Sequence, residues 1–235
     1  MGIKYIRILL KLSGEALAGE KKTGLDAATM SSICAGIKKA HDMGVEIAIV
    51  VGGGNFWRGR TSGDMERTTA DKIGMLATVM NAMAVADTLR QQGVDARVMT
   101  SLEMNQVAEP FVRDNAVRHL EKGRVVVFGG GTGNPFFSTD TGSTLRAAEI
   151  GADIMFKLTM VDGVYDKDPH KYPDAVKYDT LSFSRVLEEK LAVMDSTAAT
   201  MCRDNHLPIL VFDISDPENI VRAVRGDTIG TLVTE

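Results

Sequence analysis

Cysteine and histidine are scarce in this 235-residue chain. Its two cysteines, Cys34 and Cys202, lie far apart and neither has a CxxC partner. The four histidines are scattered as well. The sequence therefore indicates neither a disulfide framework nor a zinc site.

An excess of one charge sign and a long hydrophobic run are also missing. The 27 basic and 31 acidic residues are interspersed and give a formal net charge of −4. This pattern lacks the basic footprint expected of a protein that binds nucleic acid or an anionic membrane. The longest apolar-rich stretch, residues 73–86, is too short to span a bilayer and contains Asn81. The N-terminus leads directly into a predicted strand without a signal-peptide h-region, so we expect a cytoplasmic protein.

Two common nucleotide-binding fingerprints are absent from the sequence. There is no GxxxxGK[ST], which argues against a P-loop kinase. Two triple glycines begin at Gly52 and Gly129, but neither completes GxGxxG, because Trp57 and Asn134 stand where the third glycine is needed. A Rossmann dinucleotide site is therefore disfavoured.

Three short apolar runs that end in glycine are the main feature present. Residues 6–12 lead into Gly14, and residues 45–51 and 125–128 lead into the triple glycines. A strand that breaks into glycines before a helix lets backbone N–H groups approach an anion closely. Lys11 and Arg58 flank two of these turns, which predicts a site for several phosphates. The alternative is that the glycines only form tight turns.

Strand-like and helix-like segments alternate along the chain. Strands are predicted at residues 6–12, 45–51, 96–99, 124–128, 153–158, 208–213 and 230–234. Helices are predicted at residues 27–43, 70–92, 110–122, 139–150, 184–191, 196–205 and 217–224, with a polar loop up to residue 178. This alternation predicts an α/β fold with a mostly parallel sheet and helices on both faces. In such a sheet, ligands bind at the carboxyl ends of the strands.

Four stretches resemble the amino acid kinase family. They are residues 11–16 (KLSGEA), 52–59 (GGGNFWRG), 132–140 (TGNPFFSTD) and 161–169 (VDGVYDKDP). The third is the most specific and is similar to the bacterial branch that phosphorylates uridine monophosphate (UMP). The resemblance covers nearly the whole chain.

This resemblance implies a three-layer αβα sandwich that transfers the γ-phosphoryl group of ATP to UMP, giving UDP and ADP in pyrimidine nucleotide biosynthesis. It implies one domain over residues 1–235, in which residues 1–150 hold UMP and residues 151–235 hold ATP. It also implies Mg²⁺ held largely by phosphates and water, with no protein ligand assigned. A homohexamer and responses to GTP and UTP are further implications.

Site residues also follow from the resemblance. The implied catalytic residues are Lys11, Arg58 and Asp140. The implied ATP contacts are Lys11, Leu12, Ser13, Gly14, Gly54, Arg58, Thr159, Tyr165 and Asp168. The implied UMP contacts are Gly53, Asp71, Thr132, Gly133, Asn134, Pro135, Phe136, Phe137, Ser138 and Thr139.

Several of these residues have a plainer interpretation. Lys11 could be a solvated lysine, and Tyr165 could be a packing residue. Asp71 and Asp140 could each be a helix N-cap. Rival functions are phosphorylation of carbamate, glutamate, aspartate or N-acetylglutamate, or non-catalytic binding, as in a molybdenum storage subunit or a nucleotide sensor.

The segment 73–86 has apolar residues around its whole circumference, including Met75, Met80 and Met83. A helix of this kind is expected to be buried on more than one side. Either it lies deep inside the monomer or it forms a subunit interface.

Overall fold

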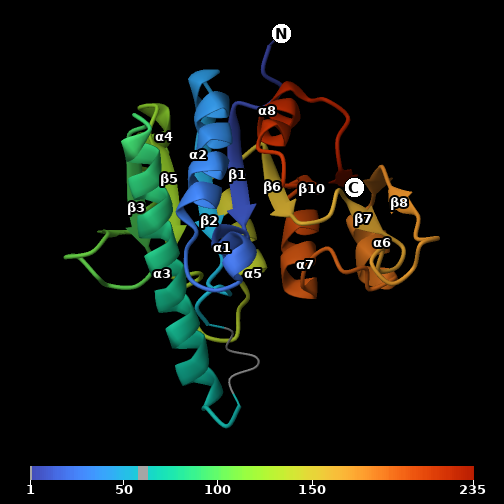
Figure 1. Ribbon diagram of the computed structural model, residues 1–235, viewed down its shortest axis with the longest axis horizontal. Coiled ribbons are helices and arrows are strands. Elements are labelled where there is room, and N and C mark those ends of the chain that lie inside the picture. Colours follow the sequence, from blue (N-terminus) through green and yellow to red (C-terminus); the bar gives the residue numbers. More distant parts are fainter. Residues whose placement is uncertain (1, 58–62) are drawn as a thin grey trace.

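A nine-stranded sheet runs through the centre of the computed structural model, which describes residues 2–57 and 63–235 (Figure 1). In spatial order its strands are β4 (Glu109–Pro110), β3 (Ala96–Thr100), β5 (Val125–Gly129), β2 (Glu46–Val51), β1 (Arg7–Leu12), β6 (Ile154–Thr159), β10 (Ile209–Asp213), β11 (Thr231–Val233) and β9 (Thr180–Leu181). Among these described strands, only the β10–β11 pair is antiparallel. The sequence-based prediction of a mostly parallel sheet is confirmed.

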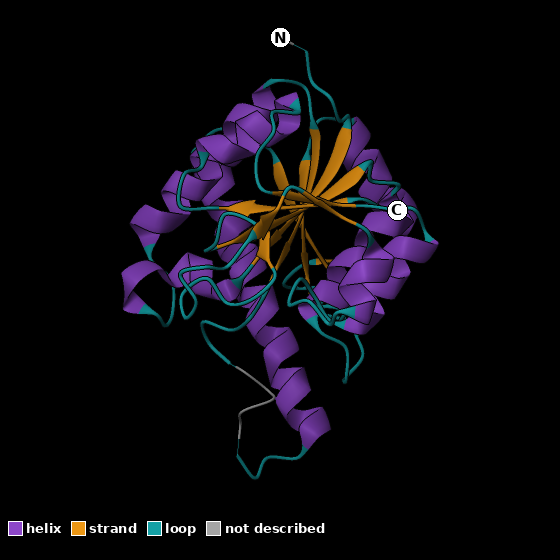
Figure 2. Ribbon diagram, turned by 90° about the vertical axis from the view of Figure 1, so that its right-hand side faces the viewer, coloured by secondary structure: helices purple, strands orange, loops and turns teal. Residues whose placement is uncertain are grey.

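Helices cover both faces of this sheet (Figure 2). One layer contains α1 (Gly14–Ala18), α2 (Ala27–Asp42), α3 (Arg67–Gln91) and α8 (Glu218–Arg225). The other contains α4 (Arg113–Glu121), α5 (Thr139–Ile150), α6 (Phe183–Glu188) and α7 (Ser196–Asp204). A short 3₁₀ turn, η1 (Gly19–Lys21), follows α1. The predicted three-layer αβα sandwich is therefore confirmed.

The apolar strands are buried on both faces because each face carries a helical layer. In β1, Ile8, Leu10 and Leu12 pack into the core beneath α2 and α8, whereas Leu9 packs into the core beneath α5 and α7. All four side chains are fully buried. The continuous apolar runs that predicted these strands reflect this two-sided burial.

The glycine-rich turns meet at one edge of the sheet. Strands β5, β2, β1 and β6 are consecutive neighbours and all run parallel. Their carboxyl ends, at Gly129, Val51, Leu12 and Thr159, consequently lie along the same edge. This edge is where the predicted ligand contacts converge.

Two helices begin three residues away from their predicted starts. Helix α3 starts at Arg67, three residues before the predicted position, with Glu66 as its N-cap. Asp71 therefore lies inside the helix, and its interpretation as an N-cap is wrong. Helix α4 starts at Arg113, because Pro110 belongs to strand β4 beside Thr100.

Short elements escaped prediction because their sequences carry too little periodicity. The predicted loop up to residue 178 contains a two-stranded hairpin, β7 (Val164–Tyr165) with β8 (Lys177–Tyr178). The five-residue helix α1 and the two-residue strands β4 and β9 were also missed. By contrast, helix α5 has the predicted bounds.

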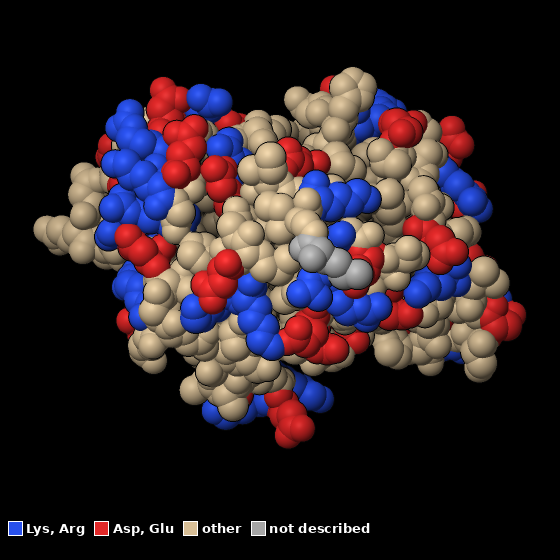
Figure 3. Space-filling model, turned by 90° about the horizontal axis from the view of Figure 1, so that it is seen from above, with Lys and Arg blue, Asp and Glu red and all other residues tan. Residues whose placement is uncertain are grey.

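The surface carries both charge signs. On the face drawn in Figure 3, Lys and Arg side chains are interspersed with Asp and Glu. No helix in the part of the chain that the structure describes combines the length and hydrophobicity needed to cross a membrane.

Candidate functional site

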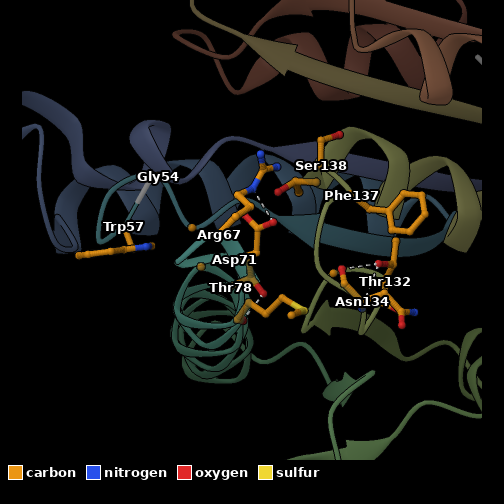
Figure 4. Close-up of a pocket in the computed structure, with 14 residues that line it drawn as sticks. Gly54, Trp57, Arg67, Asp71, Thr78, Thr132, Asn134, Phe137 and Ser138 are labelled. Atoms are coloured by element: carbon orange, nitrogen blue, oxygen red, sulfur yellow. Dashed lines mark hydrogen bonds and ion pairs between the residues drawn. The ribbon is translucent and has the colours of Figure 1, made fainter. Parts of the chain in front are cut away.

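A cavity of about 180 Å³, here called the Asp71 cavity, opens between the start of α3 and the loop before α5 (Figure 4). It is lined by Gly53, Gly54, Trp57, Arg67, Asp71, Gly74, Met75, Thr78, Gly131, Thr132, Asn134, Phe137, Ser138 and Thr139. Seven of the ten residues predicted to contact UMP are among them, together with Gly54, which was predicted to contact ATP. Residues from two distant parts of the sequence thus share one cavity.

Glycine is required at two positions in the wall of this cavity. A Cβ atom on Gly53 would lie 2.9 Å from both the Ala77 Cβ and the Gly74 carbonyl oxygen, so its absence lets the loop after β2 touch α3. Gly131 has φ of 57°, a left-handed conformation that favours glycine. These turns place main-chain groups at the cavity surface.

Asp71 links α3 to the loop before α5. Its Oδ2 accepts a hydrogen bond from the Phe136 backbone N–H at 2.8 Å and one from Arg67 Nε at 2.7 Å. Asp71 is mostly buried, with 16% of its side chain exposed, whereas 42% of Arg67 is exposed. A carboxylate therefore faces the cavity with its position set from two directions.

Asp140 lies between two lysines from neighbouring strands. Lys157 Nζ donates to Asp140 Oδ2 at 2.7 Å, and Lys11 Nζ forms an ion pair with Oδ1 at 2.9 Å. Lys11 and Lys157 are partners in the parallel β1–β6 register, so both side chains start from the same level of the sheet. Only 12–17% of each of the three side chains is exposed. The interpretation of Lys11 as a solvated lysine is therefore wrong.

Opposing effects set the pKa values in this triad. Burial acts to raise the pKa of the Asp140 carboxyl, but the charges of Lys11 and Lys157 outweigh it and hold this pKa below its usual range. Burial lowers the pKa of the Lys157 ammonium group, and the charge of Asp140 only partly offsets that effect. Asp140 is thus held ionised beside two cations.

Asp195 joins two helix N-termini next to this triad. It is the N-cap of α7, accepting from the Ala198 N–H at 3.1 Å, and it also accepts hydrogen bonds from the hydroxyl groups of Ser138 and Thr141. Ser138 in turn caps α5 by accepting from the Thr141 N–H at 3.1 Å. The cap of α5 is consequently Ser138, which corrects the interpretation of Asp140 as a cap.

A second cavity of about 450 Å³, the Tyr165 cavity, lies beside Lys157 of the triad. Thr159, Tyr165 and Asp168, all predicted to contact ATP, line it together with Lys157. The Tyr165 hydroxyl donates to Asp162 Oδ1 at 2.6 Å, so its polar end has a partner within the same loop. Asp168 Oδ1 accepts from the His170 N–H at 3.0 Å, which stabilises the turn at the cavity rim.

A third cavity, of about 290 Å³, lies next to the other two. It is lined by Ser138, Asp140, Lys157, Ala192, Val193, Met194 and Asp195, and is called the Asp140 cavity. Ser138 also lines the Asp71 cavity, and Lys157 also lines the Tyr165 cavity. The three cavities are therefore neighbours, and Asp140 lines the middle one.

Some predicted residues do not line any of the three cavities. Lys11 is one of them, although its ion pair with Asp140 links it to the Asp140 cavity. Leu12 is fully buried in the core, and Ser13 and Gly14 begin helix α1, with Ser13 as its N-cap. Within the loop before α5, this group contains Gly133, Pro135 and Phe136. Arg58 lies outside the described residues, so its predicted role stays a prediction.

Sequence reasoning missed, among other lining residues, Arg67, Thr78, Lys157 and Asp195. Lys157 had a usable signal, because a lysine near the carboxyl end of a buried strand repeats the position of Lys11. Thr78 lies inside an apolar helix and bonds to the next glycine turn, accepting from the Gly130 N–H at 2.8 Å. The contacts of Asp195 with α5 span more than fifty residues and left no local pattern.

A family model supports the interpretation of this arrangement. The model described as the amino acid kinase family matches residues 7–213, which is most of the chain. The chain belongs to the amino acid kinase family. Within this family, solved structures of similar proteins cover almost its full length.

Two bacterial family members superpose closely on this chain. It is 38% identical to the UMP kinase from Bacillus anthracis, with a TM-score of 0.95 over 98% of this chain and 96% of that one. It is 33% identical to the UMP kinase from Ureaplasma parvum, with a TM-score of 0.93 over 99% and 100% of the two chains. A uridylate kinase from Archaeoglobus fulgidus is 29% identical, with a TM-score of 0.74 over 97% and 99%.

Proposed function

We propose that this chain is a UMP kinase that transfers the γ-phosphoryl group of MgATP to UMP. The observation that carries the proposal is the set of three neighbouring cavities, with Asp140 and Lys157 lining the middle one and Lys11 paired with Asp140. The close similarity to two bacterial UMP kinases supports it. UMP occupies the Asp71 cavity, and ATP occupies the Tyr165 cavity.

The chemistry requires charge neutralisation more than a strong base. The second pKa of a phosphate monoester is about 6, so the attacking oxygen of UMP is mostly ionised at neutral pH. The difficulty is bringing two polyanions into line and stabilising charge on the transferred group. Lys11 and Lys157 supply two positive charges at the junction, and Asp140 holds them there. Arg58 adds a third cation in this proposal.

UMP binding and ATP binding fall to different halves of the chain in this proposal. The residues that line the Asp71 cavity all lie between positions 53 and 139, and those of the Tyr165 cavity between 157 and 211. This separation supports a single domain over residues 1–235, with a UMP-binding half up to about residue 150 and an ATP-binding half after it.

Mg²⁺ enters with ATP in this proposal. The two carboxylates that line the Asp140 cavity already have partners: Asp140 faces Lys11 and Lys157, and Asp195 holds Ser138 and Thr141. This donor set fits an ion carried by phosphate oxygens and water, as Mg²⁺ commonly is. Bound there, the ion would supply positive charge that neutralises the phosphate groups.

The rival activities require different chemical groups in the Asp71 cavity. An amino acid or carbamate has no ribose, whereas here a carboxylate on α3 faces a loop rich in main-chain and amide groups. A storage or sensor protein has no need of a buried lysine–carboxylate–lysine triad at the junction of two cavities. Both features favour the nucleotide kinase.

The deciding experiment is a coupled ADP-release assay with UMP, CMP, AMP, GMP and carbamate as parallel acceptors. We expect rapid ADP release with UMP and far slower release with the other four. Preference for carbamate, or ATP binding without turnover on any acceptor, would contradict the proposal. Omission of Mg²⁺ should abolish the UMP-dependent rate.

Assembly, location and regulation extend the proposal. Leu76, Met80 and Met83 are 42–45% exposed at successive turns of α3, so the prediction that this segment lies deep in the monomer is wrong for this stripe. An exposed apolar stripe of this kind supports the subunit interface, and we propose a homohexamer in the cytoplasm. Activation by GTP and inhibition by UTP remain proposals carried by the family resemblance.

A further inference from the structure

One carboxylate oxygen in the Asp71 cavity receives two donors from different elements. Asp71 Oδ2 accepts from Arg67 Nε one helical turn earlier and from the Phe136 N–H, which is 65 residues away in sequence. In Figure 4, the Arg67 and Asp71 side chains point toward each other beside the cavity. Among the described residues, no hydrogen bond reaches the other oxygen, Oδ1.

The Phe136 backbone is held in a conformation that it would not adopt freely. Its φ is 73°, in the left-handed region that non-glycine residues rarely occupy. Such strain persists only where neighbouring groups enforce it. The hydrogen bond from its N–H to Asp71 does so, and the Arg67 guanidinium lies 5.6 Å from the centre of its ring. Arg67 therefore interacts with both residues of the Asp71–Phe136 hydrogen bond.

The Arg67–Asp71 pair contributes little to the stability of the fold. It is an i,i+4 pair on a helix, and 42% of the Arg67 side chain is exposed to solvent. Pairs of this type are weakly stabilising. Of the described residues that line the cavity, Arg67 is also the one with a cationic side chain. The position of Arg67 is better explained by a role in ligand binding inside the cavity.

We propose that Arg67 is a specificity-determining residue that orients Asp71 to bind the 2′-hydroxyl of the acceptor ribose. Arg67 and the Phe136 N–H engage Oδ2 and so turn Oδ1 toward the cavity, where a hydroxyl can donate to it. A deoxyribose cannot make this bond. This inference rests on the proposed phosphorylation of UMP and adds the reason why a ribonucleotide is selected over a deoxyribonucleotide.

The alternative is that Arg67 binds the acceptor phosphate directly. The two roles predict different results, because UMP and dUMP carry the same phosphate and differ only at the 2′ position. Loss of a phosphate contact would weaken both nucleotides equally. Loss of Asp71 orientation would weaken UMP selectively.

The test compares Arg67→Met with wild type, using kcat/KM for UMP and dUMP. We expect kcat/KM for UMP to fall about tenfold, as for the loss of a hydrogen bond to a charged group, while kcat/KM for dUMP changes by less than about twofold. Binding is measured independently by the fluorescence of Trp57, the only tryptophan, which lines the same cavity. Dissociation constants for the two nucleotides should show the same selective loss.

Arg185→Met is the matched control. Arg185 also forms an i,i+4 pair, with Glu189 at 2.7 Å, and lies over an aromatic ring, that of Tyr178. It should leave the UMP-to-dUMP ratio unchanged. In an Asp71→Asn background, Arg67→Met should lower the ratio no further, because both changes remove the same contact.

Equal losses for UMP and dUMP, or an unchanged ratio in Arg67→Met, would overturn the inference while leaving the proposed function intact. A wild-type chain that phosphorylates neither nucleotide would instead refute the proposed function.

Discussion

Lys157 Nζ lies 2.7 Å from Asp140 Oδ2, and the two residues come from consecutive elements, β6 and α5, and both line the Asp140 cavity. Asp140 belongs to the first turn of α5, beside the Asp71 cavity, whereas Lys157 lines the Tyr165 cavity. The contact thus joins the two proposed nucleotide sites. Four predictions follow from this geometry and from the surface of α3.

Replacing Lys11 with alanine should reduce kcat much more than it weakens UMP binding. The lysine faces the junction through Asp140, so its charge matters most when negative charge develops on the transferred group. We expect kcat to fall by about a hundredfold or more, as for loss of one preorganised electrostatic group. Steady-state kinetics and Trp57 fluorescence titrations measure the two effects separately. Lys38→Ala, which breaks an exposed pair with Asp42, is the control; an unchanged kcat in Lys11→Ala would remove this residue from the mechanism.

The alkaline limb of kcat/KM should report the protonation of Lys157. Its pKa is lowered by burial, so the ammonium group loses its charge at lower pH than an ordinary lysine, whose pKa is about 10.4. The rate should therefore fall as pH rises through this lowered pKa. Lys157→Arg, which stays charged over the whole range, should move the fall to higher pH. Identical alkaline limbs in the two proteins would show that another group titrates.

Asp195→Asn should lower kcat by about tenfold while changing the free energy of unfolding by less than about 1 kcal/mol, since asparagine caps helices as well as aspartate does. The substitution keeps the cap of α7 but replaces an acceptor of the Ser138 hydroxyl with a donor. The start of α5, and Asp140 with it, should then shift. Asp26→Asn, at the N-cap of α2, is the control and should preserve kcat. Parallel losses of stability and activity in both variants would indicate a merely structural role.

Replacing Met80 with glutamate should break the proposed assembly. Met80 lies in the middle of the exposed apolar stripe of α3, and burying a charge there without a partner is costly. Sedimentation velocity should show particles smaller than the wild-type hexamer. Val176→Glu, which alters a comparably exposed apolar residue, should leave the mass unchanged. A wild-type protein that sediments as a monomer would refute the interface itself.

The long helices and strands, and the family, could be predicted because the sequence patterns that indicate them are confined to neighbouring residues. The apolar runs that became β1, β2 and β5 are continuous in the sequence, and α5 has the bounds that its sequence predicted. Tertiary contacts decided the remaining boundaries. Helix α3 gains an extra turn because the Glu66 side chain caps it, a contribution that its polar first turn does not reveal.

The sequence by itself determined the layered α/β architecture, the convergence of glycine turns at one sheet edge, most of the residues around the Asp71 cavity and three of those around the Tyr165 cavity. These follow from hydrophobic periodicity and short motifs, which are encoded within a few neighbouring residues. Only the tertiary structure decided that Lys157 completes the triad, that Asp195 ties α7 to α5 and that Arg67 and Phe136 share one oxygen of Asp71. Each of these contacts depends on how strands and helices pack, because side chains distant in sequence meet only after the sheet and its two helical layers have formed.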